Sequence, residues 1–266
     1  MPSAANHLSL AGKVAVVTGV GSSSGIGATT SVLFAKLGAK LSLVGEHAPS
    51  LDEVGKRCEK ENGIVPIALK GDLTDEFYVE SIAEQTNKHY GQIDILVNNA
   101  AIYGSGNIQS TSLETYDNMM KVNVRSIFHL TSLIVPYLIK SHGNIVNVSS
   151  LTGLRAFPFA LAYCMSKAAL DHFTRCIALE LAGNKVRANS VNPGTTLTGL
   201  HQRVLGLSDA EYDQLIEQRQ ELYPLGRVGY AEEVANTIAF LASDAASFIT
   251  GATLPVDGGR QLACPR

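Results

Sequence analysis

The sequence predicts a single α/β domain with a doubly wound parallel sheet and helices on both faces. Short β-branched and apolar runs alternate with longer helical patterns along most of the chain. These runs are apolar throughout, which is typical of parallel strands buried on both faces. The 266 residues, 45% of them hydrophobic, can bury one large core. We therefore expect one domain over residues 1–266, with right-handed crossovers between strands.

Seven runs are expected to be strands: KVAVV from Lys13, KLSLV from Lys40, IVPIAL from Ile64, IDILVN from Ile93, GNIVNV from Gly143, VRANSV from Val186 and ATLPV from Ala252. Helical patterns lie between them, for example over residues 26–38 and 231–243. Residues 195–228 interrupt the alternation with a long mixture of polar and apolar residues. We expect one or two loosely held helices there, forming a lid over a substrate.

Composition and targeting signals exclude several classes of protein. The net charge of −3 and pI near 6.2 give no sign of a nucleic-acid surface. The apolar run over residues 126–139 contains His129 and Pro136 and is expected to be too short and interrupted to span a membrane. The N-terminus lacks the pattern of a secretory signal, so a cytoplasmic protein is expected. The seven histidines show no metal-ligand spacing. The four cysteines, Cys58, Cys164, Cys176 and Cys264, lie far apart and indicate neither a zinc site nor a disulfide framework.

A glycine-rich segment, TGVGSSSGIG from Thr18, stands between the first strand and the first helix. Glycines let a backbone approach a pyrophosphate closely, and a helix N-terminus offers free N–H groups to it. Gly19, Gly25 and Gly27 give the spacing G-x5-G-x-G instead of the common G-x-G-x-x-G. The position of the segment favours a nucleotide-binding loop, and a plain Gly/Ser turn is the alternative.

Further motifs follow at strand ends and on helices. Tyr163 and Lys167 stand four residues apart and share one helix face. The others are Asn98–Ala101 (NNAA), Asn123 in KVNV, Ser150 at the end of a strand, and Asn192–Thr198 (NPGTTLT). Together with the glycine loop, and in this order, they resemble the short-chain dehydrogenase/reductase family in its compact form, from Lys13 to about Gly259.

The resemblance implies a Rossmann-type fold and hydride transfer between a nicotinamide cofactor and a secondary alcohol or ketone. It makes Tyr163 the general base for oxidation and the general acid for reduction. A phenol has a pKa of about 10, which is too high for a base near neutral pH. The Lys167 ammonium is expected to favour the phenolate and so to lower that pKa. The resemblance also gives Lys167 a bond to the nicotinamide ribose. Ser150 would hold the substrate oxygen, and Asn123 would hold a water that links Lys167 to solvent.

Other residues are expected to contact the cofactor by their position in the family pattern. Asp72 should meet the adenine edge, unless it only caps a turn. Ala101 stands where the family usually has glycine. The expected contacts, apart from the residue that selects NAD or NADP, are Gly19, Ser24, Gly25, Ile26, Gly27, Asp72, Leu73, Asn99, Ala100, Ala101, Tyr163, Lys167, Pro193, Gly194, Thr196 and Thr198. The family's usual loop is G-x3-G-x-G, so this chain carries two extra residues there.

The choice between NAD and NADP depends on the end of the second strand. An acidic residue there bonds the adenosine ribose and repels a 2′-phosphate. The family's NAD-type aspartate would fall at Gly45, and an NADP-type arginine at Glu46. Glu46 lies at nearly the right separation from the glycine loop, and no arginine or lysine stands beside it. We expect NAD, with NADP possible if Glu46 faces solvent.

The expected substrate residues are mostly apolar, which suits a ketone or alcohol with a hydrophobic body. They are Ser150, Leu151, Phe157, Tyr163 and Leu197, with Ile102, Tyr103, Phe159, Leu200 and Tyr223 nearby. Simple packing is the alternative for the apolar ones. Carrier-protein oxoacyl reductases of the family use surface arginines near Ser141 and Asn184, and their absence here argues against an acyl-carrier substrate.

Two alternative functions remain open. One is an NADPH-dependent carbonyl or 3-oxoacyl reductase, and the other is a non-catalytic dinucleotide-binding sensor. The complete set of Ser150, Tyr163 and Lys167 argues against the sensor. A homo-oligomer, expected to be a homotetramer, is indicated by the helix over residues 159–182, which is apolar on too many sides for one buried face.

Overall fold

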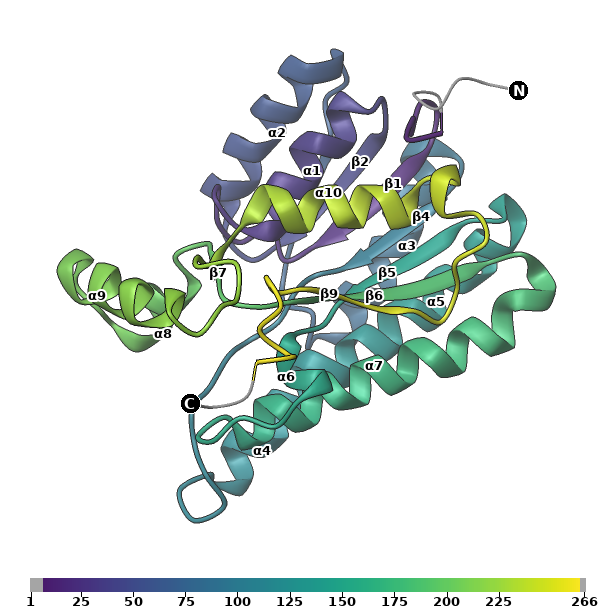
Figure 1. The fold of residues 1–266 in the computed structure, drawn as a ribbon. Helices are drawn as coiled ribbons and strands as arrows, with labels where there is room; N and C mark the ends of the chain where they lie inside the picture. The colour runs from purple at the N-terminus through teal and green to yellow at the C-terminus, as the bar shows by residue number, and fades with distance from the viewer. Residues whose placement is uncertain (1–6, 264–266) are drawn as a thin grey trace.

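The computed structural model describes residues 7–263 and contains a seven-stranded, all-parallel sheet (Figure 1). The spatial order of the strands is β3-β2-β1-β4-β5-β6-β9. Their bounds are β1 Val14–Thr18, β2 Lys40–Gly45, β3 Ile67–Lys70, β4 Ile95–Asn98, β5 Asn144–Val148, β6 Arg187–Pro193 and β9 Thr253–Val256. Each expected run overlaps one of these strands, so the predicted fold class is confirmed. The chain reverses its winding direction between β1 and β4.

Helices cover both faces of the sheet, in two groups that Figure 1 shows above and below it. One group is α1 (Ile26–Lys36), α2 (Ala48–Asn62) and α10 (Ala231–Ala242). The other is α3 (Glu76–Tyr90), α4 (Leu113–Met120), α5 (Ser126–Ser141) and α7 (Leu161–Leu181). A π-helical turn, Lys121–Arg125, joins α4 to α5. Short helical turns complete the set: α6 Leu151–Leu154, and 3-10 turns at Ala182–Asn184 and Asp244–Ala246.

The sheet divides the interior into two hydrophobic cores. Successive side chains of a strand point to opposite faces, so Val17 packs in the core with Phe34 of α1, whereas Val16 packs with Leu130 of α5. All five residues of β1 are buried. Each such buried apolar side chain stabilises the fold by about 1.5–3 kcal/mol. This two-sided burial explains why the strand runs are apolar without alternation.

The helix formed by residues 113–141 is longer than the sequence suggested. Its 29 residues are long and apolar enough, by length and composition alone, to cross a membrane, so the expectation that this run is too short was wrong. Leu130, Ile134 and Leu138 on its inner face are buried in the core shared with α3 and the sheet. This packing accounts for the apolar residues on the inner face of the helix.

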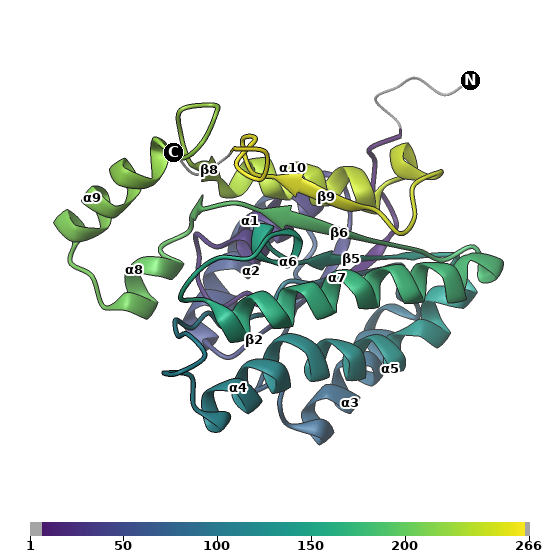
Figure 2. The ribbon, with the colours of Figure 1, turned by 60° about the horizontal axis from the view of Figure 1, so that its bottom comes forward.

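The segment expected to be a lid forms two helices, α8 (Leu200–Leu205) and α9 (Asp209–Gln220). They project from one end of the molecule beside the carboxyl ends of the strands (Figures 1 and 2). A two-stranded parallel pair, β7 (Thr196–Leu197) and β8 (Gly229–Tyr230), closes the base of the segment. Ile216, Tyr223 and Val228 form a small separate core. The segment therefore has a small core of its own and a strand pair at its base.

Candidate active site

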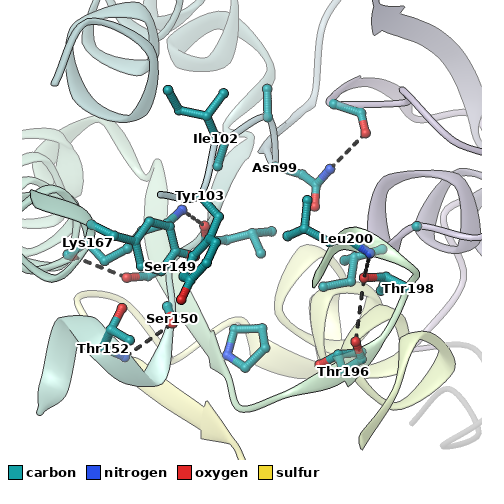
Figure 3. Close-up of a pocket in the computed structure, with 18 of the residues that line it drawn as sticks. Asn99, Ile102, Tyr103, Ser149, Ser150, Thr152, Lys167, Thr196, Thr198 and Leu200 are labelled. Atoms are coloured by element: carbon teal, nitrogen blue, oxygen red, sulfur yellow. Dashed lines mark hydrogen bonds between the residues drawn. The ribbon is translucent and has the colours of Figure 1, made fainter. Parts of the chain in front are cut away.

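A cavity of about 700 Å³ lies at the carboxyl ends of the strands. Its walls come from the residues that follow β1, β2, β3, β4, β5 and β6, together with α6, α7 and the α8–α9 segment. It includes the point between β1 and β4 where the winding reverses, which is where open parallel sheets bind ligands. Lys167, Ser150 and Tyr103 lie together at one side of the cavity, across from Thr196, Thr198 and Leu200 (Figure 3).

The ends of β1 and β4 are joined by hydrogen bonds of Thr18 and Asn99. Thr18 Oγ1 accepts from the backbone N–H groups of Asn99 and Ala100 at 3.0 and 3.1 Å. Asn99 Nδ2 donates to the Thr18 carbonyl oxygen at 2.9 Å. A Cβ atom on Gly19 or on Gly27 would lie 2.6 Å from Asn99 Nδ2. These two glycines are therefore required by the packing of the loop against β4, in addition to any contact with a cofactor.

The N-terminus of α1 is open toward the cavity. Its N-cap is Gly25, which supplies no side-chain cap, and no acidic residue stands in the first turn. The lining residues Gly21 and Gly25 leave the backbone accessible, and a Cβ on Gly21 would meet nothing within 4 Å. Ser22 Oγ is buried without a hydrogen-bond partner among residues 7–263. Free N–H groups at a helix N-terminus suit an anion, so this cradle fits the pyrophosphate of a dinucleotide.

The extra residues of the glycine loop pack beside β2 and α2. The Val20 N–H donates to the Val44 carbonyl oxygen at 3.0 Å, and Arg57 of α2 donates to the Ser23 carbonyl oxygen at 2.6 Å. A Cβ on Gly45 would lie 2.8 Å from the Val20 carbonyl oxygen. The longer loop thus leaves no room for a side chain at Gly45, where the family's NAD-type aspartate would stand. Glu46 is exposed and lines the cavity directly after it.

Asp72 lines the cavity after β3, but its carboxylate is already engaged in a local turn. Its two oxygens accept from the Thr74 backbone N–H and from Thr74 Oγ1, both at 2.7 Å. The bond from the Thr74 backbone lowers the pKa of Asp72. The turn role considered from the sequence is therefore present, and any bond to an adenine would add to it.

Tyr163 and Lys167 stand one turn apart on α7, and Ser150 follows β5. Lys167 is 1% exposed, and its Nζ donates to the Val148 carbonyl oxygen at 2.9 Å. The same Nζ lies 5.7 Å from the centre of the Tyr163 ring. The Tyr103 ring packs edge-on against Tyr163, with ring centres 5.1 Å apart. The structure thus brings the three sequence-predicted catalytic side chains to one wall of the cavity.

Burial is the largest influence on the pKa values of Tyr163 and Lys167. Burial raises the pKa of Tyr163 to about 12, although its hydrogen bond with Ser150 acts in the opposite direction. Burial lowers the pKa of Lys167 to about 8, against the field of Asp171. Lys167 is not among the main causes of the raised pKa of Tyr163, so the expectation that its ammonium lowers the phenol pKa stays a prediction.

A buried carboxylate, Asp171, lies one turn beyond Lys167 and was not singled out from the sequence. Its oxygens accept from Asn192 Nδ2 at 3.1 and 2.9 Å and from Ser190 Oγ at 3.1 Å. Asn192 Nδ2 also donates to the Ser150 carbonyl oxygen at 2.9 Å. Burial raises the pKa of Asp171. This network fixes the backbone of Ser150 between α7 and β6.

Asn123 is fully buried in the π-helical turn and does not line the cavity among the described residues. Its side chain exchanges two hydrogen bonds with the Ile102 backbone, both 2.9 Å, and donates to Ser166 Oγ at 3.1 Å. Ser166 in turn donates to the Tyr163 carbonyl oxygen at 2.8 Å. Asn123 therefore holds the segment after β4 against α7.

Most of the cofactor and substrate contacts predicted from the sequence line the cavity. Nearly all of these residues belong to the glycine loop or follow the ends of strands. Within the described part of the chain, the predicted residues that do not line it are Ser24, Gly27, Asn123, Phe159 and Leu197. Leu197 packs against the small core of the α8–α9 segment. Lining residues that the sequence did not indicate include Gly21, Ser22, His47, Gly71, Ser149, Thr152, Arg219 and Arg260.

Comparison with known proteins agrees with this geometry. Residues 19–261 match the family model described as enoyl-(acyl carrier protein) reductase. The chain belongs to the short-chain dehydrogenase/reductase family. It is 38% identical over 252 residues to the 3-oxoacyl-[acyl-carrier-protein] reductase of Thermotoga maritima, covering 94% of this chain and 98% of that protein.

Two further relatives act on alcohols and ketones, to judge by their names. The meso-2,3-butanediol dehydrogenase of Serratia marcescens is 34% identical, covering 93% of this chain and 94% of that protein. The L-sorbose reductase of Gluconobacter frateurii, solved with NADPH and L-sorbose, superposes with a TM-score of 0.89 at 28% identity, covering 97% of this chain and 100% of that one. The chain is therefore a nicotinamide-dependent oxidoreductase that acts on CH–OH groups or the corresponding ketones.

Proposed function

We propose that this protein transfers a hydride between NAD and a secondary alcohol or ketone, with Tyr163 as the proton donor and acceptor. The observation that carries the proposal is the placement of Ser150, Tyr163 and buried Lys167 on one wall of a cavity that also contains an uncapped helix N-terminus. The open N-terminus of α1 and the glycine loop fit the pyrophosphate of a dinucleotide. A bound nicotinamide supplies the hydride acceptor or donor.

The three side chains divide the proton chemistry between them. Because the pKa of Tyr163 is raised to about 12, the phenol holds its proton at neutral pH and can donate it to a ketone oxygen. Ser150 donates a second hydrogen bond to the same oxygen as negative charge develops. The Lys167 cation favours the phenolate that remains after transfer. Oxidation runs through the same groups in reverse.

We assign Lys167 and Asn123 to the path by which protons pass between the active site and solvent. Lys167 is fully enclosed by protein, so a proton needs a path to reach it. Asn123 fixes the Ile102 backbone and Ser166 beside the α7 segment that carries Tyr163 and Lys167. We assign it the role that the family resemblance implies, holding a water between Lys167 and solvent.

We favour NAD because of Glu46. Its exposed carboxylate follows β2 at the edge of the cavity, and it contributes to the raised pKa of nearby Tyr78 after burial of that phenol. A carboxylate at this place accepts from a ribose diol and repels a 2′-phosphate. Gly45 cannot carry the acidic side chain, because Val20 of the longer loop lies against it. Among the described residues at the end of β2 and directly after it, Glu46 would then be the only acid placed to bond the ribose.

An NADPH-dependent 3-oxoacyl reductase is the second candidate, since a relative with that name is 38% identical. Against it, the surface beside Ser141 and Asn184 lacks a free arginine among the described residues. Arg187, the nearest in sequence to Asn184, donates to the Ile249, Leu241 and Ser243 carbonyl oxygens. The arginines that such a docking surface would use are therefore missing at this place, although the exposed Lys140 and Lys185 flank it.

The oligomer that we propose is a homotetramer in the cytoplasm, with α5 and α7 at one of its interfaces. Phe128 of α5 is 60% exposed and its ring lies 6.1 Å from that of Phe173 of α7, while Leu179 is 82% exposed. Phe128 and Phe173 line a shallow groove with Met120, Val124 and Leu170. An apolar surface of this kind is typical of a contact with a second copy.

The test is oxidation of NADH and of NADPH over a panel of ketones, followed by reduction of both oxidised cofactors with the matching alcohols. We expect turnover with at least one ketone, and a higher kcat/KM with NADH. Turnover only with NADPH would support the second candidate. Binding of either cofactor without any turnover would support a sensor and overturn the proposal.

A further inference from the structure

The charged residues that line the cavity are divided between its two ends. The acidic ones, Glu46 and Asp72, follow β2 and β3. The arginines, Arg219 of α9 and Arg260 after β9, lie at the end formed by the lid and the C-terminal segment. That end also contains Phe157, Leu222 and Tyr223. A molecule bound beside Tyr163 at this end therefore meets apolar side chains and two guanidinium groups.

Arg260 is held in place by its neighbours. Its Cζ lies 5.7 Å from the centre of the Phe157 ring, and this stacking fixes the guanidinium over an aromatic face. Arg155, directly after α6, donates through Nη1 to the carbonyl oxygens of Arg260, Gln261 and Ala263 at 3.4, 2.9 and 2.7 Å. The segment that carries Arg260 is thus tied to the short helix that begins beside Ser150.

The turn before Arg260 is fixed as well. Asp257 is 7% exposed, and its two oxygens accept from the Gly259 and Gln261 backbone N–H groups at 3.0 and 2.7 Å. Its carboxylate is therefore used by the backbone. Within residues 7–263, no carboxylate forms an ion pair with Arg260. A half-buried guanidinium with an aromatic neighbour and no acidic partner is suited to bind an anion from outside the chain.

We propose that Arg260 is an anion subsite and that the substrate is a ketone or secondary alcohol carrying a carboxylate on an apolar body. This inference rests on the proposed function, because it takes Tyr163 and Ser150 as the groups that face the reacting oxygen. The guanidinium fork matches a carboxylate with two parallel hydrogen bonds. Phe157 and Leu222 would cover the apolar body between the two ends.

Arg219 lies at the same end of the cavity as Arg260, but its guanidinium contacts Thr195 instead of Phe157. Its Nη1 donates to Thr195 Oγ1 at 3.1 Å, directly after the Pro193–Gly194 segment expected to meet the nicotinamide. We therefore expect Arg219 to act mainly on cofactor binding, and Arg260 on substrate binding. Arg219→Gln and Arg260→Gln separate these roles, since Arg219→Gln should change KM for the cofactor and Arg260→Gln should change KM for the substrate.

The experiment uses straight-chain oxo acids of increasing length, each paired with its methyl ester, and measures kcat/KM with NADH or NADPH in excess. At the best length, the wild type should prefer the acid, and Arg260→Gln should lose about tenfold or more in kcat/KM for the acid while the ester changes little. Arg175→Gln, a change of the same kind on the exposed face of α7, is the control and should keep the preference.

Two additions protect the test against a damaged C-terminal segment. Arg260→Lys keeps the charge without the fork and should retain part of the preference. Isothermal titration of the same oxo acid into wild type and Arg260→Gln measures the subsite without turnover. Loss of the ester activity together with the acid activity would mean that Arg260 only supports the fold, and would overturn the inference.

The outcomes distinguish the inference from the proposed function. Equal kcat/KM for acid and ester in the wild type at every length, or a preference that survives Arg260→Gln, would overturn the subsite alone. Failure to reduce any acid or ester with either cofactor would overturn the proposed function. In that case, unchanged oxo-acid affinity in the variant would overturn the subsite too, and lost affinity would support it.

Discussion

The Lys167 ammonium nitrogen lies 5.7 Å from the centre of the Tyr163 ring, one turn away on α7. Burial raises the pKa of Tyr163 to about 12 and lowers that of Lys167 to about 8. In the protein alone, the pair is therefore a neutral phenol beside a cation that is easily deprotonated. This arrangement favours proton donation at neutral pH.

Tyr163→Phe should abolish turnover and leave cofactor affinity nearly unchanged, because it keeps the ring against Tyr103 and removes only the oxygen. A positioned acid or base contributes roughly 10²–10⁴-fold, so a loss of at least the lower value is expected in kcat. Stopped-flow kinetics and NADH fluorescence titration measure the two quantities. Tyr137→Phe on α5 is the control. Activity within about tenfold of wild type would contradict the role of Tyr163.

The rate of ketone reduction should fall above about pH 8. Because the pKa of Lys167 is lowered to about 8, its cation is lost from free protein above that pH. Tyr163 keeps its proton to much higher pH, since its pKa is raised to about 12. The profile of kcat/KM for the cofactor reports groups of the free enzyme. A single alkaline limb that begins only above about pH 10, the ordinary range of a phenol or lysine, would show that Lys167 is not the group that titrates.

Glu46→Arg should reduce or reverse the preference for NAD. The change removes a charge that repels a 2′-phosphate and adds a fork that pairs with it. Loss of one charged hydrogen bond to the ribose costs about 1.5–3 kcal/mol, or roughly tenfold or more in relative affinity. The measurement is kcat/KM for both cofactors with one ketone. Glu53→Arg, on the exposed side of α2, makes the same charge change away from the cavity and should leave the preference alone.

Two results would oppose this prediction. A wild type that already prefers NADPH would mean that Glu46 does not select NAD. A preference that does not move in Glu46→Arg would mean that the side chain faces solvent. Selectivity would then depend on the enlarged glycine loop, whose Gly21 and Ser22 also line the cavity.

Gly153→Ala should destabilise the protein by about 1–3 kcal/mol, because the new methyl group overlaps the Asp171 carboxylate. It would also lie 2.8 Å from the Lys167 carbonyl oxygen. Chemical denaturation measures the free energy of unfolding. The control is Gly55→Ala on α2, where a Cβ meets nothing within 4 Å and removal of a helical glycine should stabilise by about 0.5–1 kcal/mol. Equal effects of the two changes would show that α6 can move away from Asp171.

The sequence by itself determined the strands, the glycine loop and the positions of the three side chains predicted to be catalytic. Each is encoded over a short stretch: an apolar run predicts a buried parallel strand, and a four-residue spacing places Tyr163 and Lys167 on one helix face. Strand ends such as Ser150 and Asn98 follow from the same runs, because parallel strands bring their carboxyl ends to one edge. This is why most predicted cofactor contacts line the cavity.

Only the tertiary structure decided how residues far apart in the chain meet. Asp171 reads as an ordinary helix residue until α7 packs on β6, where Ser190 and Asn192 bond its carboxylate. Arg260 faces the cavity only because Arg155, more than a hundred residues earlier, holds its backbone. The raised pKa of Tyr163 likewise depends on burial by residues from elsewhere in the chain. Short-range patterns encode local conformation, whereas burial and charge depend on the packing of the whole chain, and therefore these properties could not be predicted from spacing.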